Sequence, residues 1–153
     1  MNSKIYSRSA LAGKLKACRK KRRRIVFTNG CFDFLHLGHV RLLEAARRLG
    51  DVLVVAVNSD ASVRKLKGSG RPIHPASVRT QVLAALGCVD YVTVFSEETP
   101  EKTIESLKPD ILVKGGDYSL RGILGRHLVK RVVRIPMVPG FSTTRLIQRL
   151  KKI

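Results

Sequence analysis

Continuous apolar runs alternate along the chain with segments whose apolar residues recur at helical spacing. Residues 52–57 (VLVVAV) are all apolar and predict a strand buried on both faces, as in a parallel sheet. Between residues 37 and 49 the apolar positions fall three or four apart, and Gly50 follows, which is typical of a helix closed by a glycine. The same patterns predict strands at 25–28, 91–95, 111–113 and 132–137, and helices at 9–19, 76–86, 100–107, 120–130 and 144–152.

This order of elements predicts the α/β class: a single Rossmann-like domain with a five-stranded parallel sheet and helices on both faces. A chain of 153 residues is long enough to bury one such core. We expect the basic, helical residues 1–24 to form one unit with the domain at 25–153. Asn29-Gly30 signals a turn after the first strand. Ligands bind such sheets beyond the carboxyl ends of the strands, so we expect four polar clusters to converge there: 28–33, 58–60, 114–117 and 141–144.

The net charge of +19 comes from the two ends of the chain. Residues 1–24 hold 10 Lys and Arg and no acid, residues 119–153 hold 9 and no acid, and the middle holds 11 of each sign. Such an excess favours anionic partners: phosphorylated small molecules, nucleic acid or an acidic membrane surface. A solvated basic face is the simpler interpretation of 20–24 (KKRRR). Aromatic residues make up only 5% of the chain, so charge alone supports nucleic-acid binding.

Cysteine usage and hydropathy bear on the compartment. Cys18, Cys31 and Cys88 are far apart and form no C-x-x-C pair, which indicates free thiols in a reducing environment. No apolar run approaches the ~20 residues that a membrane span needs, and no apolar region of a secretory signal follows the basic N-terminus. We therefore expect a cytoplasmic protein with no membrane partner.

The segment 27–39 (FTNGCFDFLHLGH) carries the densest chemistry. Gly30 and Gly38 allow close backbone approach, and the helix that follows points its N-terminal amides and positive dipole end at the expected cleft. His36 and His39 are three residues apart and therefore face the same side of that helix. Two imidazoles there can donate to phosphate oxygens, so the segment predicts an anion site.

Other chemistry at this segment is less well supported. Cys31, His36 and His39 could together bind zinc, but their spacing matches no zinc pattern and no fourth ligand is evident. Cys31 as a nucleophile lacks a surrounding nucleophile signature. Neither a GxxxxGK[ST] sequence nor a helix-opening GxGxxG is present. We expect no metal ligands on the protein itself.

At this point a family resemblance becomes clear. The spaced pattern of Thr28, Gly30, Phe32-Asp33, His36 and Gly38-His39 resembles the signature of the cytidylyltransferase-like nucleotidyltransferases, in which H-x-G-H binds nucleotide phosphates. Within that superfamily the resemblance is closest to the adenylyltransferase domain of ADP-heptose synthesis, and it extends along nearly the whole chain. The segments that carry it are FTNGCFD, HLGH, VAVNSDASVRKLKG, RPIHP, VLAALGCVDYV, LVKGGDY and FSTTRLI.

The resemblance implies a reaction between ATP and D-glycero-β-D-manno-heptose 1-phosphate that gives ADP-heptose and pyrophosphate. The sugar phosphate would attack the α-phosphorus in line without a covalent enzyme intermediate, so catalysis would rest on positioning and charge stabilisation. Mg²⁺ would accompany ATP, held largely by phosphates and water. The resemblance also makes a homodimer plausible, and a separate sugar kinase would supply the acceptor.

The resemblance also implies residue roles. Four cationic side chains would act on the reacting phosphates: His36, His39, Lys67 and Arg79. Without the resemblance, Arg79 would be taken for a helix-surface residue, Asp33 for a turn residue and the 142–144 hydroxyls for helix caps. The acceptor would contact Asn58, Asp60 and Lys65, with Lys65 also the alternative to Lys67. Nucleotide binding falls to Thr28, Asn29, Gly30, Cys31, Phe32, Asp33, Gly38, Lys114, Gly115, Gly116, Asp117, Phe141, Ser142, Thr143 and Thr144.

Three departures bear on specificity. Met137 occupies the position of an arginine in related cytidylyltransferases, which favours ATP over CTP. Pro139 and Phe141 replace an acidic residue and a tyrosine expected in the heptose branch, and 119–131 is shorter and free of acids. Two alternatives stay open: a related alcohol-phosphate enzyme, such as a glycerol-3-phosphate cytidylyltransferase or an FMN adenylyltransferase, and a basic nucleic-acid-binding module.

Overall fold

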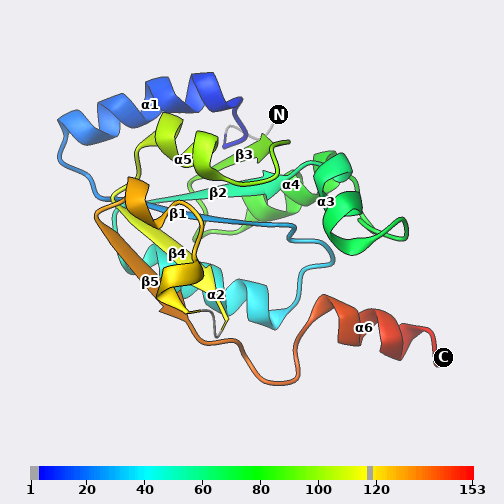
Figure 1. The fold of residues 1–153 in the computed structure, drawn as a ribbon. Helices are drawn as coiled ribbons and strands as arrows, with labels where there is room; N and C mark the ends of the chain where they lie inside the picture. Colours follow the sequence, from blue (N-terminus) through cyan, green and yellow to red (C-terminus); the bar gives the residue numbers. More distant parts are fainter. Residues whose placement is uncertain (1–3, 117–118) are drawn as a thin grey trace.

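Five parallel strands form one sheet at the centre of the computed structural model, which describes residues 4–116 and 119–153. The order across the sheet is β3-β2-β1-β4-β5 (Figure 1). The chain builds β1, β2 and β3 outward in one direction and then returns to place β4 on the other side of β1, so the order reverses between β1 and β4. The strands are β1 (Ile25–Gly30), β2 (Val52–Asn58), β3 (Tyr91–Phe95), β4 (Ile111–Gly115) and β5 (Arg131–Ile135).

Helices cover both faces of this sheet, as the sequence predicts (Figure 1). Two apolar clusters fill the space between the layers, because alternate residues of β1 and β2 point to opposite faces. The α/β class and the five-stranded parallel sheet are thereby confirmed. The helices are α1 (Arg8–Lys20), α2 (Leu37–Arg47), α3 (Asp60–Lys67), α4 (Ala76–Ala85), α5 (Glu101–Leu107) and α6 (Thr143–Leu150).

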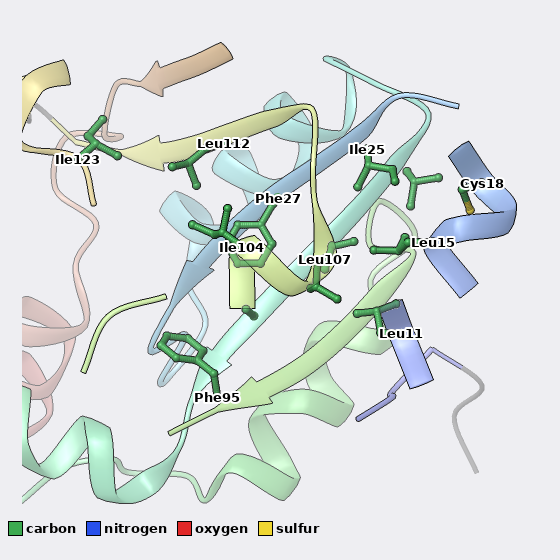
Figure 2. Packing of buried hydrophobic residues seen from close by; sticks show 13 residues of the cluster. Leu11, Leu15, Cys18, Ile25, Phe27, Phe95, Ile104, Leu107, Leu112 and Ile123 are labelled. Carbon is green, nitrogen blue, oxygen red and sulfur yellow. The ribbon is translucent and has the colours of Figure 1, made fainter. Parts of the chain in front are cut away.

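The first cluster ties the basic N-terminal helix to the domain. Leu11 and Leu15 of α1 are fully buried and lie against the β1 and α5 side chains (Figure 2). Phe27 and Leu107 complete the contact from β1 and α5. The charged residues of α1 lie on its outer surface, so this helix contributes apolar packing on one side and positive charge on the other.

The last helix is attached differently. None of the described residues of α6 is buried, and Figure 1 shows the helix standing apart from the sheet at the C-terminal end. Its N-terminus is positioned by a hydrogen bond from the Thr143 hydroxyl to the backbone carbonyl of Asp33, at 2.9 Å. In the described part of the chain, no helix is both long enough and apolar enough to cross a membrane.

Three local predictions are wrong. Residues 120–130 form two short 3₁₀ turns, Leu120–Gly122 and Arg126–Leu128, because Gly125 adopts a positive φ of 82° that breaks any helix there. Asn29 and Gly30 continue β1 and pair with β2, where a turn was expected. The strand predicted at 132–137 also stops early, at Ile135, because Pro136 follows it.

Candidate active site

A cavity of about 470 Å³ opens at the carboxyl ends of β1, β4 and β5, beside the N-termini of α2 and α6. This is where the strand order reverses, which is the usual ligand position in such a sheet. The structure brings most of the predicted site residues to its wall: Asn29, Gly30, Cys31, Phe32, Asp33, His36, Gly38, His39, Asn58, Lys67, Lys114, Gly115, Ser142, Thr143 and Thr144.

The start of α2 positions the two histidines. His36 is the N-cap, and its Nδ1 accepts a hydrogen bond from the Gly38 N–H at 3.1 Å. The His39 ring stacks on the His36 ring with 3.9 Å between centroids. A Cβ on Gly38 would lie 2.9 Å from the His36 ring, so this close arrangement requires glycine. Because Nδ1 of His36 accepts, its proton must sit on Nε2 when the ring is neutral.

Both histidines are neutral at pH 7 in the free protein. Burial lowers the pKa of His36. Burial, together with the neighbouring His36, lowers the pKa of His39 to about 4. The Nδ1 atom of His39 is buried and has no hydrogen-bond partner among the described residues. A bound phosphate would supply negative charge to these rings and favour their protonated forms.

Asp33 is a buried clamp and does not contact either histidine ring by a hydrogen bond. Its carboxylate accepts from Arg71 Nε at 2.8 Å, the Ile73 N–H at 2.7 Å and the His74 N–H at 3.0 Å. Burial alone would raise the pKa of Asp33, but these hydrogen bonds and the Arg71 charge lower it below its ordinary value. Asp33 therefore stays ionised and fixes the loop after α3 against the β1–α2 loop.

The β1–α2 loop is held in an uncommon backbone conformation. Phe32 and Phe34 have backbone φ angles of 46° and 57°, which residues other than glycine seldom adopt. Such conformations persist only where surrounding contacts enforce them. The three hydrogen bonds to Asp33, which lies between the two phenylalanines, supply such contacts.

Arg79 departs most from its predicted role. Its side chain is buried and does not line the cavity. The guanidinium donates to the carbonyls of His74, Cys31 and Asn58 and pairs with Asp60 at 2.7 Å. All of its donor nitrogens are therefore occupied, and the geometry fits a residue that joins the loops of the site more than one that touches phosphate directly.

Other predicted residues also lie off the cavity wall. Thr28 is buried in β1, and its hydroxyl has no hydrogen-bond partner in the described part of the chain. Asp60 caps α4 by accepting from the Ala76 N–H at 2.8 Å. Asp117 lies outside the described residues. The remaining predicted residues that do not line the cavity are Lys65, Gly116 and Phe141.

Lys114 is a half-buried cation at the end of β4. Its Nζ donates to the Asn29 side-chain oxygen at 2.6 Å, and burial lowers its pKa to about 8. No carboxylate of the described residues forms an ion pair with it. An anion in the cavity would provide the missing counter-charge.

Arg71 is the main residue that sequence reasoning missed. It lines the cavity, and its Nε is held by Asp33. No Nη atom of Arg71 has a hydrogen-bond partner among the described residues, so up to four N–H donors remain for a ligand. The sequence offered one signal for this role, because Arg71 lies in a segment rich in glycine and proline at residues 67–75. The other lining residues that were not predicted are apolar: Leu42, Leu66, Ile135, Pro136, Met137 and Val138.

The geometry of the site bears on two further roles, Cys31 as a nucleophile and metal binding by side chains of the cavity. Burial raises the pKa of the Cys31 thiol, which disfavours the thiolate form of a nucleophile. Asp33 is the carboxylate on the cavity wall, and its oxygens are engaged by three donors. In the described part of the chain, no group of three or more His, Cys, Asp and Glu residues could hold a metal ion.

The fold and the cavity together define an α/β domain whose cavity at the strand switch point is lined by two histidines, two lysines and the N-termini of α2 and α6. The family described as cytidylyltransferase-like matches residues 27–149, and the chain belongs to this family of nucleotidyltransferases.

Known relatives agree with this assignment. The chain is 53% identical to the bifunctional protein HldE of Trichlorobacter lovleyi, over 97% of this chain and 31% of that protein. It is 49% identical to the bifunctional protein HldE of Geobacter sulfurreducens, over 99% of this chain and 32% of that protein. The chain thus spans about a third of the length of these relatives.

A solved structure shows the same fold. It is the lipopolysaccharide core biosynthesis protein from Thermoplasma volcanium, with a TM-score of 0.66 and 32% identity, over 76% of this chain and 98% of that one.

Proposed function

We propose that this chain transfers AMP from ATP to D-glycero-β-D-manno-heptose 1-phosphate, giving ADP-heptose and pyrophosphate. The observation that carries the proposal is the cavity of stacked histidines, helix N-termini and a half-buried lysine at the strand switch point, in a chain about half identical to HldE proteins along nearly its whole length. The lipopolysaccharide core biosynthesis protein of similar fold supports a sugar nucleotide as the product.

In the proposed reaction, a phosphate oxygen of the acceptor attacks the α-phosphorus of ATP. The new P–O bond forms as the bond to the bridging oxygen breaks, and that electron pair leaves with pyrophosphate. His36, His39 and the amides at the start of α2 stabilise the charge that develops on the phosphates. No side chain has to form a covalent bond.

The two sides of the cavity suggest how the substrates divide it. Lys114, Gly115 and the apolar segment 135–138 lie on the β4–β5 side and suit the nucleoside and α-phosphate of ATP. Asn58, Lys67 and Arg71 lie on the other side and suit the phosphate of the acceptor. Arg79 acts as a positioning residue, because it donates hydrogen bonds to backbone carbonyls of three segments around the cavity.

The mode of Mg²⁺ binding that we propose depends on which oxygen ligands the cavity offers. Because the Asp33 carboxylate is fully engaged by the protein, we propose that Mg²⁺ enters with ATP and is held by phosphate oxygens and water. It would neutralise triphosphate charge. We further propose that the enzyme acts in the cytoplasm as a homodimer, and that a kinase acting on the anomeric hydroxyl of the sugar supplies the acceptor.

A pyrophosphate-release screen tests the proposal directly. ATP or CTP is paired with heptose 1-phosphate, glycerol 3-phosphate, FMN and other sugar phosphates, with Mg²⁺ present. We expect rapid release only with ATP and heptose 1-phosphate. Absence of release with that pair would overturn the proposal, and release with CTP and glycerol 3-phosphate would favour the cytidylyltransferase alternative.

A further inference from the structure

A second hollow lies at the opposite, amino end of the sheet and collects positive charge that the active site does not use. We propose that this basic hollow binds a small compound with several phosphate groups, at a site separate from the catalytic cavity. It encloses about 640 Å³. The residues that line it are Arg19, Arg22, Arg23, Arg24, Asp110, Ile111, Lys130 and Arg131.

The hollow joins two segments that are far apart in the sequence. Residues 19–24 form the end of α1 and the turn after it, residues 130–131 lie at the start of β5, and both segments lie at the same end of the sheet (Figure 1). These belong to the two ends of the chain that hold all of its excess positive charge. Folding therefore brings positively charged residues from both ends of the chain together in one hollow.

The charge in the hollow is not balanced by its own residues. Six cations line it together with one carboxylate, Asp110. That carboxylate is already engaged, because it pairs with Lys130 at 3.1 Å and accepts from the Ile25 N–H at 2.9 Å. The neighbouring Asp51 accepts from the Arg24 N–H at 2.7 Å. Five guanidinium charges thus remain within the hollow, and a polyanion would relieve their mutual repulsion.

Part of the hollow is already ordered for a ligand. Arg19, Arg23 and Arg24 each donate to a backbone carbonyl of a neighbouring segment, at 2.9, 3.1 and 3.4 Å. A carbonyl orients a guanidinium but does not neutralise it. Arg22 and Arg131 are exposed, and their side chains have no hydrogen-bond partner in the described part of the chain. Three placed cations and two free ones can therefore surround one anion.

The shape and chemistry of the hollow favour a compact phosphate compound over nucleic acid or a membrane. Its volume lies within the range of about 300–1,000 Å³ usual for small-molecule sites. Guanidinium groups bind phosphate oxygens in pairs, which suits an arginine-rich lining. Ile111, the apolar lining residue, is buried, and none of the described exposed large apolar side chains lines the hollow. Bases would find no ring to stack on, and lipid would find no apolar anchor.

The basic hollow is distinct from the catalytic cavity. It lies at the first residues of β1 and β5, whereas the cavity lies at their last residues. Strands of five or six residues place the two sites on the order of 20 Å apart. One phosphate compound cannot fill both sites at once, so they can be measured separately.

Titration of the full chain with sodium tripolyphosphate, followed by backbone amide NMR shifts, tests the proposal. We expect saturable shifts at residues 19–24 and 130–131, in addition to shifts around the catalytic cavity. The double variant Arg22→Ala/Arg131→Ala should weaken binding at the hollow at least about tenfold, because it removes two charge-assisted contacts. Pyrophosphate release in the catalytic assay should stay unchanged, which also shows that the variant folds.

A control variant that loses the same amount of charge distinguishes specific binding at the hollow from non-specific electrostatic attraction of the anion. Lys16→Ala/Lys102→Ala removes two exposed cations from α1 and α5, outside the hollow. The proposal is overturned if this control weakens binding as much as the arginine variant, or if shifts at the hollow fail to saturate. Single-stranded DNA and phosphatidylglycerol vesicles form two further arms, and tighter binding of either through the same residues would overturn the choice of a small ligand.

Discussion

At the scale of single residues, His36 and His39 limit each other's protonation. Two stacked imidazolium rings with centroids 3.9 Å apart would repel strongly, and burial adds to the cost of charging either ring. In the free protein both rings are therefore neutral, and each can still donate one N–H hydrogen bond. In the proposed reaction, hydrogen bonds from these rings to phosphate oxygens would strengthen as negative charge develops in the transition state.

Replacing one histidine tests this role. We expect His39→Ala to lower kcat at least about 100-fold, because it removes the imidazole proposed to donate to the reacting phosphates. The exposed His127→Ala serves as the control and should leave kcat unchanged. Steady-state pyrophosphate release measures both. A kcat of His39→Ala close to that of His127→Ala would reduce His39 to a packing role.

Lys114 should set an alkaline limit on the proposed reaction. Its pKa of about 8 means that the free enzyme loses this positive charge as the pH rises through 8. Because the cation is the form that attracts phosphate, kcat/KM for ATP should fall above pH 8, where neither histidine is titrating. Lys114→Arg keeps its charge and should hold kcat/KM level to about pH 10. A wild-type profile that stays level to pH 10 would contradict this assignment.

At the scale of elements, the site is assembled from loops that buried ions tie together. Asp33 joins the β1–α2 loop to the loop after α3, and Arg79 joins three backbone segments from the start of α4. Thr143 links α6 to the same β1–α2 loop. Each functional loop is therefore positioned by a neighbouring loop as well as by its own strand.

Loss of the Asp33 clamp should affect both stability and substrate binding. We expect Asp33→Ala to lower the free energy of unfolding by about 3 kcal/mol, because it leaves a largely buried guanidinium without its partner. The KM of the acceptor should rise, because Arg71 is no longer held. Glu44→Ala breaks the exposed pair with Arg41 and should cost less than about 1 kcal/mol. Denaturant unfolding compares the two, and equal effects would contradict the clamp.

The elements were more predictable from sequence than the partners of the site residues. Residues 52–57 indicate a buried strand without any tertiary information. Gly50 was expected to close the helix before it, but α2 ends at Arg47 and its C-cap is Arg48. The partners of Asp33 lie 38 to 41 residues away, so no local pattern could reveal them. Arg79 follows the pattern of a surface helix residue, yet it is buried because four acceptors surround it. Gly125 broke a predicted helix through its own backbone angle.

At the scale of the whole molecule, net charge should govern how fast substrates arrive. Both proposed substrates are anions, and a protein of charge +19 attracts them over distances that salt screens. Raising NaCl from about 0.05 to 0.5 M should lower kcat/KM by roughly tenfold and leave kcat within about twofold. Sucrose at matched osmolarity is the control. A kcat/KM independent of salt would mean that arrival is not electrostatically steered.

The same positive surface would act on the pyrophosphate that the proposed reaction releases. Pyrophosphate carries several negative charges, so a field that draws ATP toward the stacked histidines and Lys114 would also retain pyrophosphate there. Pyrophosphate should therefore inhibit competitively with ATP, and its inhibition constant should rise with added NaCl in initial-rate assays. An inhibition constant that ignores salt would contradict electrostatic retention. Net formation of the proposed sugar nucleotide would then depend on a separate reaction that hydrolyses pyrophosphate.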